Sequence, residues 1–250
     1  MTINASVGQP DMADPVLLNN VDHADVRVRT GHGAEFGDAI NLVRVFVPEF
    51  EELQREYPIL LRRTAGQSLH AVVLLGLDRD ENLFLADGGW SGRYVPALLE
   101  RGPFSIGVAG QGAGVSGSEP MIHIDLDHVR ISKDEGHSLF LPQGGNSPYL
   151  DHVADVLRAI FTGVEIEKTI FAAFEKHGLI EPISIEVKLD DAHQYKLSDF
   201  CTISLDRLMQ LDGAALEKLH RADYFRAAIW IASSLRNISR LIDMKNAKGG

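Results

Sequence analysis

The sequence contains a single cysteine, Cys201, among its 250 residues. One cysteine cannot form a disulfide within the chain, and it cannot supply the several thiolates of a cysteine-based zinc site. Cys201 follows Phe200 in a predicted buried strand, where a thiol packs as a small apolar group. The cysteine content therefore fits a reducing compartment.

Positive charge and long apolar runs are also scarce. The formal net charge is -11 at pH 7, which argues against general affinity for nucleic acid or anionic lipid. The most apolar windows, 71–77 and 227–232, are far shorter than the roughly 20 residues of a membrane span. The first residues lack the basic and apolar segments of a secretory signal. We therefore expect a cytoplasmic protein with no membrane span and no nucleic-acid partner.

Several familiar catalytic spacings do not occur: GxSxG, SxxK, HExxH, the P-loop and the EF-hand. Residues 112–117 match the GxGxxG spacing, which binds dinucleotides only where a helix follows. Here the following residues, SEPMIHID, predict a strand that begins at a proline. We interpret 107–118 as a flexible glycine-rich loop and expect no cofactor.

The composition is that of an ordinary globular chain, with 45% hydrophobic and 24% charged residues. We expect a flexible N-terminal arm at 1–20 and one domain at 21–245. In the first half, short helices are predicted at 48–56 and 95–101. Strands are predicted at 26–29, 40–47, 60–63, 69–77, 82–86, 104–108, 121–126 and 137–141. We expect 60–63, 69–77 and 82–86 to form a meander, in which each strand pairs with the next, and 121–126 to pair with 137–141.

The second half has helical spacing around one hairpin. Ser147 is the expected N-cap of a long helix, or of a broken pair, that ends near Gly178. Alternating apolar residues at 183–189 and a return strand at 195–203 predict the hairpin. Helices are then expected at 205–211, 214–220 and 223–244. The pattern predicts an α+β fold, with a mostly antiparallel sheet, a long central helix and a helical C-terminal segment.

The stretch DGGWSGRYVP at 87–96 carries three glycines beside Trp90, Arg93 and Tyr94. Glycine permits a sharp turn, which would present these side chains at the end of the sheet. Aromatic faces with polar tips and a planar guanidinium are common at recognition surfaces. One interpretation is therefore a binding site.

The other interpretation of this stretch is purely structural. Trp90 would then close one end of the core, and the Arg93 guanidinium would pair with an acid such as Glu49 or Glu56. The residue types alone leave both interpretations open.

His123 and Asp125 suggest a different chemistry, because alternate residues of a strand share one face. They could supply two members of the two-histidine, one-carboxylate set that binds iron, with His137 or His193 as a third ligand. The helical C-terminal half does not provide the strands of the jelly roll that usually carries such a set. Surface or hydrogen-bonded residues are the favoured interpretation, and we expect no metal.

Four segments carry a family resemblance: LNNVDHADVRV, FVPEFEELQREYPI, LLGLDRDENLFLADGGWSGRYVPALLERGPF and LDGAALEKLHRADYFRAAIWIASSLRNISRL. Over about residues 17–243 the sequence resembles the SapC family of bacterial proteins. The family's name comes from a surface-layer locus. Its members commonly lie in gene neighbourhoods with TonB-dependent receptors and tryptophan-halogenase-like flavoproteins. The resemblance supplies no catalytic residues.

Two hypotheses follow from the residues and the resemblance. The first is a non-catalytic binding or accessory protein, whose partner is a protein, a peptide or a small nutrient-related ligand. It would bind through Tyr57, Trp90, Arg93 and Tyr94. The second is a metal-dependent, oxygenase-like enzyme that uses His123 and Asp125.

Overall fold

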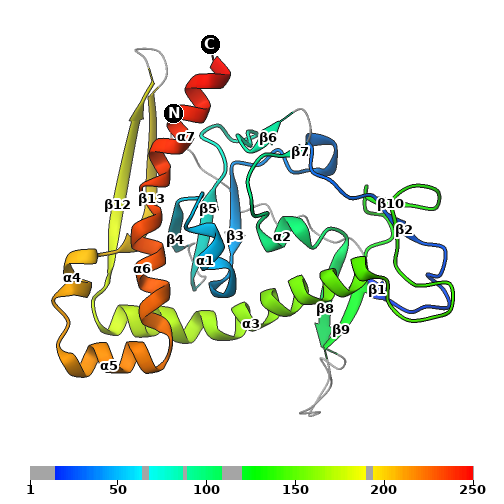
Figure 1. Cartoon of the computed structure of the whole chain (residues 1–250). Coiled ribbons are helices and arrows are strands. Elements are labelled where there is room, and N and C mark those ends of the chain that lie inside the picture. The colour runs from blue at the N-terminus through cyan, green and yellow to red at the C-terminus, as the bar shows by residue number, and fades with distance from the viewer. Residues whose placement is uncertain (1–14, 64–67, 87–88, 109–119, 190–193, 250) are drawn as a thin grey trace.

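The centre of the fold is a five-stranded antiparallel sheet in the order β12-β13-β4-β5-β3 (Figure 1). Its strands are β3 (Leu42–Val45), β4 (Ile59–Arg63), β5 (Leu69–Leu74), β12 (Ile180–Lys188) and β13 (Gln194–Ile203). This computed structural model describes residues 15–63, 68–86, 89–108, 120–189 and 194–249. Together with the helices below, the sheet confirms the predicted α+β class.

A long helix, α3 (Pro148–Lys176), runs along one side of the molecule (Figure 1). The Ser147 hydroxyl accepts the Leu150 N–H at 3.2 Å, so the predicted N-cap is confirmed. Gly178, with φ of 62°, follows the helix end, as the sequence predicts. The helix is continuous, which decides between the long helix and the broken pair.

The C-terminal segment consists of α4 (Leu205–Met209), α5 (Gly213–Arg221), α6 (Tyr224–Ser234) and α7 (Asn237–Gly249). The segment expected to be helical at 223–244 is helical, but a turn at 235–236 divides it into α6 and α7. The side-chain amide of Asn237 donates to the carbonyls of Gln54 at 2.8 Å and Tyr57 at 3.1 Å. These bonds anchor the start of α7 to the loop that follows α1 (Phe50–Leu53).

Three smaller sheets complete the β structure: β1-β9-β8, β10-β2-β11 and β6-β7. Their strands are β1 (Val16–Leu17), β2 (Arg27–Val28), β6 (Leu85–Ala86), β7 (Gly89–Trp90), β8 (Phe104–Val108), β9 (Pro120–Ile124), β10 (Ile131–Ser132) and β11 (His137–Ser138). The expected pairing of 60–63 with 69–77 is confirmed as β4 with β5, but those of 69–77 with 82–86 and of 121–126 with 137–141 are wrong. β5 already has β3 and β4 as neighbours, and β9 has β1 and β8.

The expected N-terminal arm needs a correction at its end. Val16 and Leu17 pair with Ile124 and His123 of β9, so this part of 1–20 belongs to a sheet. Residues 1–14 lie outside the described residues, as does most of the glycine-rich stretch at 107–118. Cys201, expected to be buried, is only partly buried in β13.

Two apolar clusters form the core, and α3 contributes to both. The larger cluster joins the five-stranded sheet to α1 and α6 and includes Phe171 and Phe174 of α3. The smaller cluster lies under the small sheets and includes Val153 and Leu157 of α3. Within the described ranges, no helix has both the length and the apolar character that crossing a membrane requires.

Candidate functional site

Tyr57, Trp90 and Tyr94 form one hydrogen-bonded cluster beneath the surface. Tyr57 is fully buried, and its hydroxyl donates to the Tyr94 carbonyl at 2.5 Å. Trp90 Nε1 donates to the Tyr57 hydroxyl at 3.0 Å and to the Tyr94 carbonyl at 3.2 Å. The polar groups of Tyr57 and Trp90 are thus satisfied within the protein, so these two side chains serve as the framework of the stretch.

Two glycines in this stretch have different roles. Gly89 has φ of 108°, a conformation that other residues resist. Gly92 instead permits a close approach, since a Cβ there would lie 2.3 Å from the Tyr57 hydroxyl oxygen and 2.9 Å from Trp90 Nε1. Gly88 lies outside the described residues.

Arg93 is exposed at the surface above this cluster. Its backbone N–H donates to Glu56 Oε2 at 2.6 Å, whereas Glu56 Oε1 lies 3.1 Å from the Arg240 guanidinium. The alternative that pairs the Arg93 guanidinium with Glu56 or Glu49 is therefore wrong. Within the described part of the chain this guanidinium has no ion-pair partner.

Glu49 binds the hydroxyl end of Tyr94, whereas Tyr57 and Trp90 bind its carbonyl. The buried carboxylate of Glu49 accepts the backbone N–H groups of Phe46 and Ala97, each at 2.8 Å, and the Tyr94 hydroxyl at 3.2 Å. Burial raises the pKa of Glu49 to about 7, although these donors act to lower it. The carboxyl group joins the 3-10 turn η2 (Val47–Glu49) to α2 (Ala97–Glu100).

An open groove of about 870 Å³ lies beside the framework, between the loop at 30–36 and the hairpin of β6 and β7. The loop includes the 3-10 turn η1 (Ala34–Phe36). The groove is lined by Thr30, Gly31, His32, Gly33, Ala34, Glu35, Phe36, Leu83, Leu85, Ala86, Gly89 and Lys248. It is larger than a second groove, of about 550 Å³, between the segments 20–27 and 138–144.

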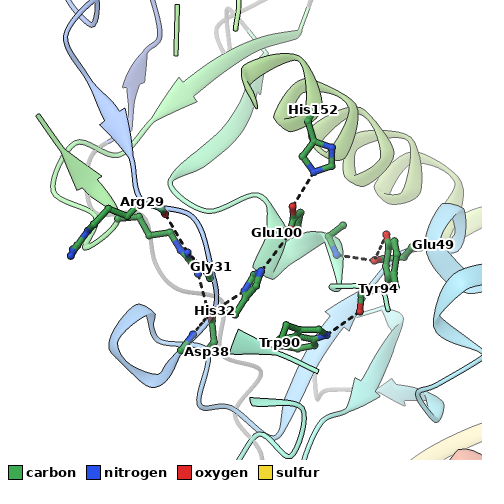
Figure 2. A network of polar contacts seen from close by, with 12 residues as sticks. Arg29, Gly31, His32, Asp38, Glu49, Trp90, Tyr94, Glu100 and His152 are labelled. Carbon is green, nitrogen blue, oxygen red and sulfur yellow. Dashed lines mark hydrogen bonds and ion pairs between the residues drawn. The ribbon is translucent and has the colours of Figure 1, made fainter. Parts of the chain in front are cut away.

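His32, in the wall of the groove, contacts two carboxylates (Figure 2). Its Nδ1 lies 3.2 Å from Asp38 Oδ2, and its Nε2 lies 3.4 Å from Glu100 Oε2. Glu100 Oε1 in turn lies 2.9 Å from His152 Nε2 on α3. The ring of His32 also meets the ring of Trp90, so the framework and the groove wall are in direct contact.

These neighbours determine the charge of His32. Burial by itself would lower the pKa, but the hydrogen bonds with Asp38 and Glu100 raise it to about 9. The imidazole is therefore charged near neutral pH, with both N–H groups directed at carboxylates. Since neither nitrogen is free to accept a proton, His32 does not act as a general base there.

Arg130 completes the network and fixes the loop. Its Nη2 lies 3.0 Å from Asp38 Oδ2, and its Nη1 donates to the carbonyls of Arg29 and Gly31. Its guanidinium carbon lies 4.2 Å from the centre of the Phe36 ring. A small cavity of about 50 Å³ lies behind the loop, against Arg130. The loop at 30–36, which forms one wall of the groove, is thus fixed by contacts at several points along its length.

The sequence does not reveal this network. His32, Asp38, Glu100 and Arg130 come from three distant segments, and the Arg130–Asp38 pair is separated by 92 positions. The one available signal was a histidine between glycines in the segment TGHGAEFGD at 30–38. That segment predicts a turn, but it does not indicate which acids the imidazole will meet.

Within the described residues, no third ligand joins His123 and Asp125. His123 Nδ1 lies 3.2 Å from the Met121 carbonyl, and Asp125 Oδ1 accepts the Asp127 N–H at 3.0 Å. His137 stacks on Tyr149, with ring centroids 5.3 Å apart, and His193 lies outside the described residues. Among the described residues, no group of three or more His, Cys, Asp or Glu is placed to hold a metal ion.

The fold and the site define an α+β protein with an open groove, one wall of which is fixed by a buried ion network. A sequence model of the SapC family matches residues 18–241, which is most of the chain. The chain therefore belongs to the SapC family, as the resemblance indicated. Searches of curated proteins and of solved structures found no match.

Proposed function

We propose that this SapC-family chain is a non-catalytic binding protein that holds a small ligand in the groove. One observation carries the proposal: the loop at 30–36, which lines one wall, is fixed by the buried contacts of His32, Asp38 and Arg130. A wall that is ordered before the ligand arrives does not lose conformational entropy on binding. The volume, about 870 Å³, is within the usual range of ligand sites.

The chemistry of the groove supports binding more than catalysis. His32 has both nitrogens engaged with carboxylates, which leaves it as a fixed cation near neutral pH. The lining residues include no cysteine, no serine and no tyrosine, and the one threonine, Thr30, has no basic side chain hydrogen-bonded to it among the described residues. An activated nucleophile needs such a base.

In this proposal Tyr57, Trp90 and Tyr94, which the sequence analysis identified, support the groove wall and do not contact the ligand. Trp90 contacts His32, while Tyr57 and Tyr94 hold Trp90 in place. Arg93 lies outside the groove lining and is exposed, so it is a candidate contact for a partner protein rather than for the small ligand.

We also propose that the protein works in the cytoplasm, as an accessory to nutrient uptake of the TonB-dependent kind. The proposed location rests on the acidic charge and the single cysteine. The proposed pathway rests on the gene neighbourhoods of the family.

The test is a binding screen against a variant with a blocked groove. Free amino acids, dipeptides, short carboxylic acids, sugars and nucleosides would be screened by ligand-observed NMR. Ala86→Trp fills the groove from an exposed position, and Ala172→Trp makes the same change on the exposed face of α3. We expect at least one compound to bind the wild type and Ala172→Trp, but not Ala86→Trp. Equal binding to all three proteins would refute the proposal.

A further inference from the structure

Among the described residues, the groove contains one acid and one base without an ionic partner. Glu35 is exposed in η1, and no ion pair or hydrogen bond of its carboxylate occurs within these residues. Lys248 of α7 reaches the backbone carbonyls of Asn82 at 3.3 Å and Leu85 at 3.4 Å, and it forms no ion pair within the described ranges. Its neighbour Lys245 differs, because it binds both Asp78 and Glu81 at 2.6 Å.

The charges of the buried network cancel one another, so the network does not neutralise Glu35 or Lys248. His32 and Arg130 supply two positive charges, and Asp38 and Glu100 supply two negative ones. The network is therefore neutral as a unit. Of the described lining residues, Glu35 and Lys248 supply the remaining charges that a ligand meets, and they come from two different elements, η1 and α7.

The Glu35 carboxylate lies close to Gly33 of the same loop. A Cβ at Gly33 would lie 2.3 Å from Glu35 Oε2, the end of a flexible side chain. The loop backbone beneath it is fixed by Asp38, which accepts the Gly33 N–H at 3.1 Å. The exposed Glu35 carboxylate is available to a cationic group of a ligand.

Part of the remaining lining is apolar. Leu83, Leu85, Ala86 and Phe36 supply hydrocarbon or aromatic surface. A fitting ligand therefore combines one cationic group, one anionic group and apolar side chains, and the volume of about 870 Å³ leaves room for more than a single small amino acid.

We infer that the ligand is a short peptide with free ends and apolar side chains. Its α-ammonium group pairs with Glu35, its α-carboxylate pairs with Lys248, and its side chains lie against Leu83 and Leu85. This inference rests on the proposed function, since it names the ligand class of the same groove. A purely anionic ligand would leave Glu35 unpaired, and a sugar would use neither charge.

The test compares three forms of one dipeptide by isothermal titration calorimetry. The probes are L-leucyl-L-leucine, its N-acetyl derivative and its C-terminal amide. The wild type should bind the free dipeptide about three- to tenfold more tightly than either blocked form, the range of a partly exposed charged contact. The penalty for acetylation should disappear in Glu35→Gln, and the penalty for amidation should disappear in Lys248→Gln.

Glu165→Gln and Lys168→Gln are the matched controls, because they make the same charge changes at exposed positions on α3, outside the groove. Both should retain the two penalties. Equal affinity for the three probes, penalties that persist in the groove variants, or no saturable binding of any form would overturn the inference. If another compound binds Ala172→Trp but not Ala86→Trp, the proposed binding function stands even though the peptide inference fails.

Discussion

The imidazole of His32 meets the indole of Trp90 edge to face, with ring centroids 5.4 Å apart and an interplanar angle of 67°. Trp90 lies 6.0 Å from Phe84 on its other side, and Phe84 lies 4.5 Å from Tyr57, all measured between ring centroids. A line of aromatic rings therefore connects the buried core to the groove wall. Substitutions at Tyr57 or Phe84, at the core end of this line, should therefore alter the position of His32 in the groove wall.

Replacement of Trp90 should cost stability, whereas replacement of Arg93 should not. Trp90→Ala removes a packed ring and leaves the Tyr57 hydroxyl without its donor, so we expect a loss of about 3–5 kcal/mol in the free energy of unfolding. Arg93→Ala, at an exposed side chain without an ion pair, should change it by less than about 0.5 kcal/mol. Urea denaturation measures both. A large loss in Arg93→Ala would show a structural role that the contacts do not reveal.

Gly92 should tolerate no side chain. A Cβ there would lie 2.3 Å from the hydroxyl of the rigid, buried Tyr57, so Gly92→Ala should destabilise the protein by about 1–3 kcal/mol through overpacking. Gly213 at the start of α5 is a matched control, since a Cβ there meets no atom within 4 Å. Gly213→Ala should be neutral or slightly stabilising. Equal effects at both sites, measured by thermal unfolding, would contradict the close approach.

The charge on His32 should make the stability of the protein depend on pH. The pKa of His32 is about 9 in the folded state, against 6.5 for an unperturbed histidine. Because the folded value is the higher one, the contribution of His32 is fully present below pH 6.5 and is lost as the pH rises through about 9. The full effect is of the order of 2–3 kcal/mol.

The comparison that isolates this effect is wild type against His32→Gln, with urea denaturation at pH 6, 7.5 and 9. The stability difference between the two proteins should be largest at pH 6 and should shrink toward pH 9. The subtraction removes the contributions of other titrating groups, such as Glu49. A difference that stays constant with pH would show that folding does not raise the pKa of His32.

Purified protein should contain no stoichiometric transition metal. His123 and Asp125 each make local hydrogen bonds, and the described residues bring no third ligand to them. Protein purified without a chelator would be analysed by inductively coupled plasma mass spectrometry. Iron or zinc near one atom per chain, lost in His123→Ala, would instead support the oxygenase-like hypothesis.

Local signals in the sequence predict the elements better than their pairing. The cap at Ser147 and the alternation in β12 and β13 concern neighbours along the chain, and the structure confirms both. The pairing of β9 with β1 depends on segments about a hundred residues apart, and periodicity carries no information about it.

The candidate site likewise depends on contacts between residues that are distant in the sequence, which local patterns do not predict. Glycine and aromatic content drew attention to 87–96, and the hairpin there does border the groove through Gly89. The role of Trp90 as a support, rather than as a contact, depends on its bond to the Tyr57 hydroxyl, 33 positions away. Likewise the charge of His32 depends on Glu100, which only the packing of α2 brings close.

The most direct test of the central claim is an amide chemical-shift map of the wild type titrated with L-leucyl-L-leucine. If the groove is the binding site, saturable shifts should concentrate at Gly31, Gly33, Ala34 and Gly89, and Gly213 should not move. Saturable shifts that avoid the groove, or shifts that persist unchanged in Ala86→Trp, would contradict the account.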